Sequence, residues 1–270
     1  MAIQNKMLDL EEIPDYVNLM VYGKSGVGKT RFAGSDDRVV FIAPEDDGTL
    51  SAKRAGSKAK QWPVKCWADL IEAKEYFEEQ AQSNGTINVN WIVIDSGTEM
   101  QQMAMRHILR EQKELREYRD IDLPEIQDWQ KWYNMFLRVV KEFNALPCNV
   151  LWTALVSSST DEEGNQFLHP AIQGKGYEIA QSFASYMTSY GCMQVKVVPA
   201  RDQEGNPIEK DGKPVKKEIR QITWKDTGII QGKDRTGVLA PFTRDLTLKE
   251  VRELIQNGPN AVPTEIKESA

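Results

Sequence analysis

The chain alternates short apolar runs with longer stretches in which apolar residues recur every three or four positions. The apolar runs occupy residues 16–23, 38–45, 89–96 and 149–156, and they are rich in β-branched or aromatic residues. Runs of this length that end at Gly, Pro, Asp or Ser are typical of buried strands. We therefore predict four buried strands in the first 160 residues.

The segments between these runs carry helical spacing. Helices are expected to open at 29–34 and to cover 70–82 and about 99–118, with an interruption at 119–124. The next segment repeats apolar residues three or four positions apart, at Trp129, Trp132, Tyr133, Phe136, Leu137, Val140 and Phe143. This stripe predicts a helix packed against a sheet. Strands that alternate with helices predict parallel βαβ units, and hence an α/β fold, a three-layer sandwich with a mostly parallel central sheet.

The pattern changes after residue 190. Alternating segments around the turn-forming stretches "EGNP" and "DGKP" predict an antiparallel hairpin at about 192–226. A closing helix follows, with Thr247 and Glu250 at capping-box spacing and Gly258 at its end. We expect one core over residues 18–258, an N-terminal extension at 1–17 and a disordered tail at 259–270.

Composition narrows the class of protein. The 270 residues are 40% hydrophobic and 27% charged, with a formal net charge of −6. This charge excludes a globally basic nucleic-acid-binding surface but permits a local basic stripe. The three widely spaced cysteines form no CxxC pair, which argues against a disulfide or zinc framework. No apolar run approaches the roughly 18 residues of a membrane span, so we expect a cytoplasmic protein with no membrane partner.

One motif carries a specific chemistry. The residues of 23–30 match G-x-x-x-x-G-K-[ST], between a predicted strand and a predicted helix. Glycines allow backbone N–H groups to turn around phosphate oxygens, the lysine reaches the β and γ phosphates, and the hydroxyl can ligate Mg²⁺. We therefore predict that ATP phosphates are bound by Gly23, Lys24, Ser25, Gly26, Val27, Gly28, Lys29 and Thr30.

Two carboxylates end predicted strands. Asp95 closes "WIVID", where an acid can hold a magnesium ion together with Thr30. Glu45 closes "VVFIAPE", where an acid near the γ-phosphate can act as a general base. The adjacent Asp46 and Asp47 leave a solvated acidic turn as the alternative for Glu45.

Three further features are open to two interpretations. Lys233 and Arg235 would point the same way in an extended segment and could stabilise charge on a γ-phosphate, or they could form a surface pair. The polar loop 157–176 contains the candidate DNA-binding residues Phe167, His169 and Lys175, or it is only a connector. The lysine-rich hairpin either contacts phosphates or protects a sheet edge.

Taken in order, these segments resemble the core of RecA-like P-loop ATPases. They are most similar to compact phage relatives that act as single-strand annealing proteins or mini-recombinases, and to phage AAA-domain nucleotide-binding proteins. "VVFIAPEDD" resembles the strand that ends in the catalytic glutamate, and "VIDS" at 93–96 resembles the Walker B strand. "GKGYEIAQSFASY" at 174–186 is similar to the segment that leaves the second DNA-binding loop, which places that loop at 157–176 and the first at about 118–124.

The resemblance implies an assembly. "KDRTGVLAPF" at 233–242 resembles the element that reaches the γ-phosphate of the neighbouring subunit, so Lys233 and Arg235 would act in trans in a homo-oligomer with ATP at its interfaces. Single-stranded DNA is the implied partner, together with a single-strand-binding protein. The strand before the second loop departs from the family pattern, since Thr153 and Ser157 are the polar candidates for its switch residue.

The resemblance implies an ATP-binding, Mg²⁺-dependent ATPase that is stimulated by single-stranded DNA in phage recombination or replication. A P-loop kinase of nucleotides or small molecules is one alternative, because kinases share the phosphate-binding motif. A ring helicase or partner-loading ATPase on the same core is another.

Overall fold

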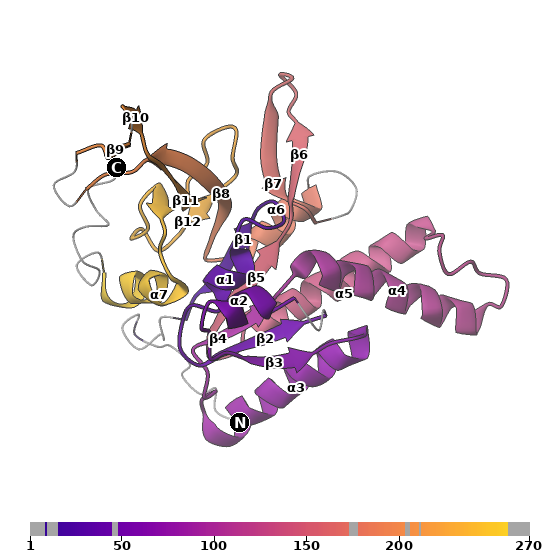
Figure 1. The fold of residues 1–270 in the computed structure, drawn as a ribbon. Coiled ribbons are helices and arrows are strands. Elements are labelled where there is room, and N and C mark those ends of the chain that lie inside the picture. The colour runs from indigo at the N-terminus through magenta and orange to yellow at the C-terminus, as the bar shows by residue number, and fades with distance from the viewer. Residues whose placement is uncertain are drawn as a thin grey trace.

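A nine-stranded, mostly parallel sheet runs through the middle of the molecule (Figure 1). The computed structural model describes residues 9, 16–44, 48–172, 178–202, 206–210 and 212–258. The strand order is β13-β11-β8-β1-β5-β4-β2-β3, and β12 pairs with β8. These strands are β1 (Asn18–Tyr22), β2 (Val39–Ala43), β3 (Lys60–Pro63), β4 (Trp91–Ile94), β5 (Asn149–Ala154), β8 (Ser189–Pro199), β11 (Lys216–Thr223), β12 (Lys233–Asp234) and β13 (Phe242–Arg244).

Helices cover both faces of the sheet. They are α1 (Lys29–Ala33), α2 (Leu50–Arg54), α3 (Trp67–Asn84), α4 (Gly97–Leu115), α5 (Ile126–Asn144), α6 (Glu178–Ser185) and α7 (Leu248–Asn257). Alternate residues of β1 show the division: Met20 and Tyr22 pack in the cluster that contains α3 to α6, whereas Leu19 and Val21 pack in the cluster that contains α1, α2 and α7. The predicted α/β class with a mostly parallel sheet is therefore confirmed.

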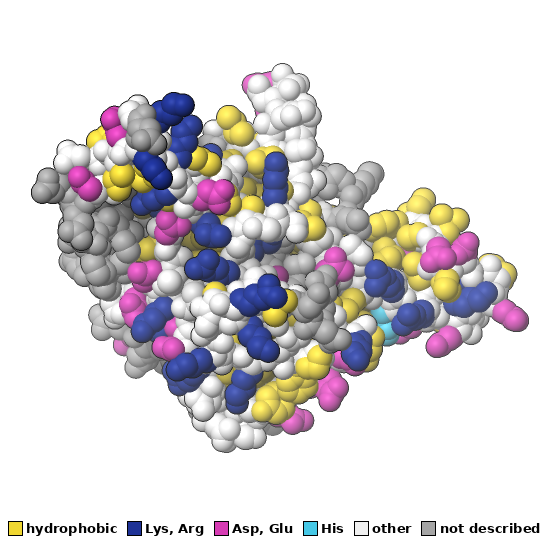
Figure 2. Space-filling model, in the orientation of Figure 1, with side chains coloured by type: hydrophobic (Ala, Val, Ile, Leu, Met, Phe, Trp, Pro, Cys, Tyr) yellow, Lys and Arg dark blue, Asp and Glu magenta, His cyan; other side chains and the backbone are white. Residues whose placement is uncertain are grey.

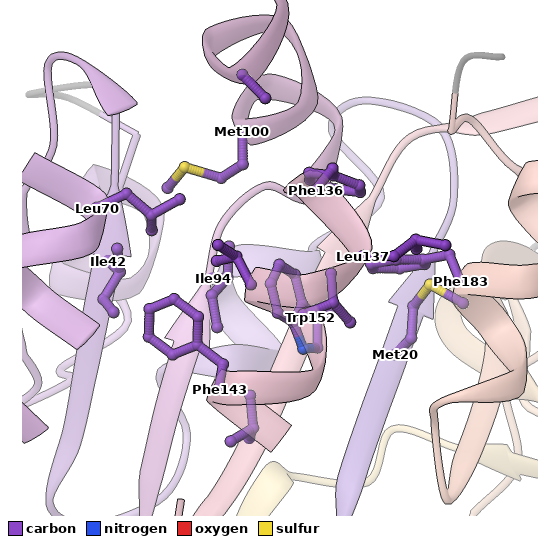
Figure 3. Packing of buried hydrophobic residues seen from close by; sticks show 14 of the residues in the cluster. Met20, Ile42, Leu70, Ile94, Met100, Phe136, Leu137, Phe143, Trp152 and Phe183 are labelled. Carbon is purple, nitrogen blue, oxygen red and sulfur yellow. The ribbon is translucent and has the colours of Figure 1, made fainter. Parts of the chain in front are cut away.

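Aromatic rings fill the layer between the sheet and α5. Trp152 of β5 meets Phe183 of α6 edge to face at 5.4 Å, and Phe183 stacks on Phe136 of α5 at 5.8 Å (Figure 3). Aromatic pairs in these arrangements contribute beyond the area that they bury. The apolar stripe of α5 is thus a packing surface, as its spacing predicts, although Trp129 at its start remains 38% exposed.

The C-terminal part adds antiparallel strands to the parallel core. The first residues of β8 pair with β1 in parallel, and residues 192–199 pair with β11 in antiparallel register. The predicted hairpin is confirmed, and its first strand begins three residues earlier than expected because β8 also belongs to the parallel sheet. The capping box at Thr247 and Glu250 is present at the start of α7.

The polar segment after β5 differs from its prediction as a loop. Residues 156–170 form a two-stranded ribbon of β6 (Val156–Thr160) and β7 (Gln166–Pro170), which projects from the sheet in Figure 1. A second small ribbon joins β9 (Glu209–Lys210) to β10 (Lys213–Pro214). Such ribbons are held by backbone hydrogen bonds, which do not depend on the side chains. Because β6 is rich in serine, it has no apolar pattern from which a strand could be predicted.

The ends of the chain leave two predictions untested. The expected tail at 259–270 lies outside the described residues, as does most of the expected extension at 1–17. Within the described part of the chain, the helices are too short or too polar to cross a membrane.

Candidate nucleotide-binding site

The phosphate-binding motif forms the connection between β1 and α1. Gly26 and Gly28 have φ angles of 79° and 105°, in the left-handed region that favours glycine. At Gly23 a Cβ atom would lie 2.4 Å from the carbonyl oxygen of Met193, so only glycine allows β8 to approach this closely. The backbone of the loop therefore requires glycine at all three of these positions.

Lys29 is hydrogen-bonded to the backbone of the phosphate-binding loop. Its Nζ donates hydrogen bonds of 2.9 Å to the carbonyl oxygens of Gly23 and Lys24, and the residue is buried. Burial lowers the pKa of Lys29, and the carboxylate of Asp95 opposes this shift. A buried cation beside an open glycine loop is a favourable neighbour for an anion such as a phosphate group.

Asp95 connects the loop to the middle of the sheet. It follows β4, and its Oδ2 accepts a hydrogen bond of 2.6 Å from Thr30 Oγ1. The hydroxyl of Thr153, a buried residue of β5, donates to the other carboxylate oxygen. Because β5 lies between β1 and β4, the hydrogen bond from Thr153 holds the Asp95 carboxylate from within the sheet.

The oxygens of Thr30 and Asp95 fit a magnesium ion. Mg²⁺ prefers oxygen ligands and keeps several waters, so it needs only one or two protein groups besides phosphate oxygens. The described residues contain no cluster of three or more His, Cys, Asp or Glu side chains that could hold a metal alone. A metal at this position would therefore depend on Thr30, Asp95 and the bound phosphates together.

Glu45, the predicted general base, lies outside the described residues, as do Asp46 and Asp47. The preceding strand β2 pairs in parallel with β4, from Val39 opposite Trp91 to Ile42 opposite Ile94. The chain therefore leaves β2 at the same edge of the sheet at which Asp95 follows β4. The catalytic role of Glu45 stays a prediction.

Arg220 of β11 contacts the phosphate-binding loop, although no sequence motif marks it as a site residue. A Cβ atom at Gly28 would lie 2.5 Å from Arg220 Nε, which is buried and lacks a hydrogen-bond partner within the described structure. Arg220 also lines a cavity of about 250 Å³, together with Arg31 and Met193. The sequence contains only a weak signal for this residue, its position in a basic strand.

Lys233 and Arg235 lie away from the loop of their own chain. Lys233 pairs with Tyr190 of β8, which pairs with Met20 of β1, two residues before the end of that strand. Its Nζ donates to the carbonyl oxygens of Ala184 at 3.1 Å and Ser185 at 3.4 Å. Burial, with a smaller contribution from Arg235, lowers the pKa of Lys233 to about 8. Arg235 is exposed.

The candidate DNA-binding residues occupy the β6–β7 ribbon. Phe167 and His169 are buried in β7, with ring centroids 5.8 Å apart, and His169 Nε2 lies 2.8 Å from Ser159 Oγ. Burial lowers the pKa of His169. Lys175 lies outside the described residues. In the described conformation neither ring is available for stacking on a base.

The two predicted DNA loops carry more acidic than basic side chains in the part that the structure describes. The turn of the β6–β7 ribbon contains Asp161, Glu162 and Glu163, and the ribbon is otherwise mostly uncharged in Figure 2. The segment at 118–124 joins α4 to α5, where Tyr118 and Leu123 are exposed. Buried Arg119 pairs there with Glu125 and Asp128.

Tyr22 joins the phosphate-binding loop to both neighbouring segments. Its hydroxyl lies 3.0 Å from the carbonyl oxygen of Leu168 in β7 and 2.6 Å from that of Gln231, just before β12. Because Tyr22 directly precedes Gly23, the loop, the ribbon and the strand of Lys233 share one anchor. The apolar pattern of the sequence identifies Tyr22 only as a member of the buried strand.

The chain matches a known family model over most of its length. The family model described as "AAA domain" matches residues 15–236. No curated protein matches the chain. One similar solved structure is an ATPase from the type III secretion system of pathogenic bacteria, at 15% identity and a TM-score of 0.42; the match covers 66% of this chain and 52% of that one. Another is a KaiC-like protein from Pyrococcus horikoshii OT3, at 14% identity and a TM-score of 0.38, over 76% and 78% of the two chains.

Proposed function

This chain belongs to the AAA-domain family of P-loop ATPases, and from that premise we propose that it hydrolyses ATP with Mg²⁺ in a site completed by a second copy. The observation that carries the proposal is the pair of hydrogen bonds on Asp95, from Thr30 of the phosphate-binding loop and from Thr153 of the intervening strand. The loop and the strand-end acid are thus already joined.

Each residue of the site has a distinct task. The N–H groups of residues 23–28 and the ammonium of Lys29 bind the phosphates, and Thr30 and Asp95 hold the magnesium ion. The ion neutralises phosphate charge when it is bound. Glu45 would take a proton from the attacking water.

The trans role of Lys233 and Arg235 belongs to the same proposal. It is supported by their position, set back from the loop of their own chain, and by the exposure of Arg235. Cations that approach a γ-phosphate from a neighbouring subunit stabilise the charge of the transition state. This arrangement requires a homo-oligomer with ATP at its interfaces.

The proposed partner is single-stranded DNA, in phage recombination or replication in the host cytoplasm, together with a single-strand-binding protein. The resemblance to compact RecA-like proteins supports it, and the hydrogen bond from Tyr22 connects the nucleotide loop to the β6–β7 ribbon, which occupies the predicted second DNA loop. Because the turn of that ribbon is acidic, we expect DNA phosphates to contact other parts of the surface.

The test is ATP hydrolysis by the purified full chain, with and without Mg²⁺. We expect Lys29→Ala and Asp95→Asn to lower the rate at least about 100-fold, the usual effect of removing a preorganised charge-stabilising group. Lys53→Ala on α2 and Asp226→Asn, both exposed, are matched controls and should retain the parent rate. Undiminished hydrolysis in Lys29→Ala, or transfer of the γ-phosphate to a sugar or nucleotide acceptor instead of water, would contradict the proposal.

The DNA partner is tested separately, by adding single-stranded DNA across a salt series. Electrostatic contacts predict a stimulation of hydrolysis that fades as the salt concentration rises. Hydrolysis that is unchanged by DNA at low salt would remove DNA from the proposal and leave the ATPase in place.

A further inference from the structure

A second cavity lies far from the phosphate-binding motif in the fold, at the amino ends of β2 and β3. Its volume is about 600 Å³, within the range of pockets that take a small ligand. The walls are the edge strand β3, the helix α3 and the segment just before β4. We call this cavity the edge groove; none of the residues assigned to ATP binding lines it.

Positive charge predominates in the edge groove. Arg38, Lys58 and Lys60 line it, with Asp37 as the one carboxylate among the lining residues. The guanidinium of Arg38 donates to two neutral amide oxygens, of Asn88 at 3.1 Å and Asn90 at 2.6 Å. Within the described ranges, none of the three cations has a carboxylate at ion-pair distance, whereas Asp37 lies 3.8 Å from Lys249. The groove therefore presents uncompensated cations to a ligand.

Two aromatic rings adjoin these cations. Trp62 of β3 and Tyr76 of α3 have ring centroids 5.0 Å apart at 45°, and Tyr76 is 43% exposed. Lys58, Lys60 and Trp62 occupy alternate positions, so they share one face where the chain is extended. Because Trp62 contacts Tyr76, that face is the one directed at the groove.

We propose that the edge groove binds a nucleotide unit, with its base stacked on Tyr76 and Trp62 and its phosphate held by Lys58, Lys60 and Arg38. Aromatic rings beside a cationic groove are the chemistry by which proteins hold unpaired nucleotides. The glutamates of α3 at 72, 75 and 79 are exposed and do not line the groove, so the cations on the strand side are the charges that a phosphate would meet there. Such a unit can be a free nucleotide or part of a single-stranded nucleic acid.

The experiment uses the full chain with Lys29→Ala, so that the phosphate-binding loop does not contribute to binding. The probes are a fluorescein-labelled thymidine oligonucleotide and AMP, and binding is measured across a salt series that starts at low salt. Tyr76→Ala should weaken binding about tenfold, since stacking on one aromatic ring is commonly of this size, and Tyr76→Phe should preserve it. Replacing both Lys58 and Lys60 by Ala should reduce the slope of log affinity against log salt concentration by about 1.4, or about 0.7 for each phosphate that is no longer neutralised.

The matched control replaces Lys210 and Lys213 by Ala, two exposed lysines paired across the β9–β10 ribbon. If the oligonucleotide binds and AMP does not, and Tyr76→Ala weakens that binding, the ligand is a nucleic acid. If AMP binds and Tyr76→Ala weakens its binding, the ligand is a free nucleotide. Equal binding by the groove variants and their parent, or a loss confined to the control, would overturn the proposal. Because the parent for these tests already lacks a working loop, this failure is distinguishable from failure of the ATPase proposal.

Discussion

At the scale of single residues, the phosphate-binding loop depends on the missing side chains of its glycines. The absence of a side chain at Gly23 admits the backbone of β8, and its absence at Gly28 admits the guanidinium of Arg220. The loop is therefore contacted by two segments from the C-terminal third of the chain. Arg220 is held in register because its backbone N–H donates to Asp245 Oδ1 at 2.8 Å.

We predict that Arg220→Met weakens the binding of ATP about tenfold, since a hydrogen bond to a charged group contributes about 1.5 to 3 kcal/mol. Isothermal titration with a slowly hydrolysed ATP analogue measures the change. Lys217→Met, at an exposed lysine of the same strand, is the matched control and should leave the affinity unchanged. Equal affinity in Arg220→Met and the parent would show that this cation does not meet the nucleotide.

The fixed positions of the site could be predicted from the sequence, because their chemistry constrains their spacing. The eight residues of the loop and Asp95 at the end of a buried strand are recognisable in this way. Arg220 could not be predicted, since it reaches the loop only through the pairing of β8 with β11. The anchoring contacts of Tyr22 could not be predicted either, since its hydroxyl meets carbonyl oxygens more than a hundred residues away in the sequence. Thr153 is recognisable as a polar residue of its strand, but its pairing with Asp95 depends on the strand order.

At the scale of elements, α7 is fastened to the core by a buried charge. The carboxylate of Asp36 is fully buried and accepts hydrogen bonds from Arg252 of α7, at 2.6 and 3.0 Å, and from Trp91 of β4 at 2.8 Å. Burial alone raises the pKa of Asp36, but the hydrogen bonds from Arg252, Asp37 and Trp91 outweigh it and hold the pKa below its usual range.

We predict that Asp36→Asn lowers the free energy of unfolding by about 3 kcal/mol at pH 7, because Arg252 loses the partner of a buried ion pair. Since the pKa is lower in the folded protein, this stabilisation is complete above about pH 4, the ordinary value for Asp, and is lost as the pH falls through the folded value. Urea denaturation of both proteins between pH 7 and pH 3 measures the difference.

The neighbouring Asp37→Asn is the control for this measurement, because Asp37 is exposed and lies 3.8 Å from Lys249. We expect a change within about 0.5 kcal/mol. A difference between Asp36→Asn and the parent that persists undiminished at pH 3 would contradict the assignment of the stability to the ionised carboxylate.

The elements that the sequence pattern predicts are those with a long or continuous apolar signal. The four buried strands, α5 and the hairpin of β8 and β11 belong to this group. The short α2 and β3, and the β6–β7 ribbon, have mixed or polar sequences. The place of β3 is decided by its pairing with β2, and β6 and β7 are strands because they pair with each other. A four-residue strand such as β3 offers too few positions for a periodicity to be detected.

At the scale of the whole molecule, the two ends of the sheet have different chemistry. The carboxyl ends of β1 and β4 carry the phosphate-binding loop and Asp95, and the amino ends of β2 and β3 carry the edge groove. Figure 2 shows further Lys and Arg side chains over α1, α2 and the β9–β10 ribbon, although the net charge of the chain is −6. An acidic protein can thus present local basic surfaces, as the composition allowed.

Lys233 in β12 lies level with Met20, two residues before the end of β1 and thus away from the loop of its own chain. This position has a consequence for mixtures of two defective subunits. One variant, Lys29→Ala, lacks a working phosphate-binding loop but keeps Lys233 and Arg235. The other variant keeps the loop, but Lys233 and Arg235 are both replaced by Ala. If the cations act in trans as proposed, each variant should be inactive alone, and a head-to-tail contact between them should rebuild one complete site. Random assembly of equal amounts should restore about a quarter of the parent ATPase activity, since one interface in four joins a working loop to working cations. A mixture as inactive as its components would show that Lys233 and Arg235 serve the chain that carries them.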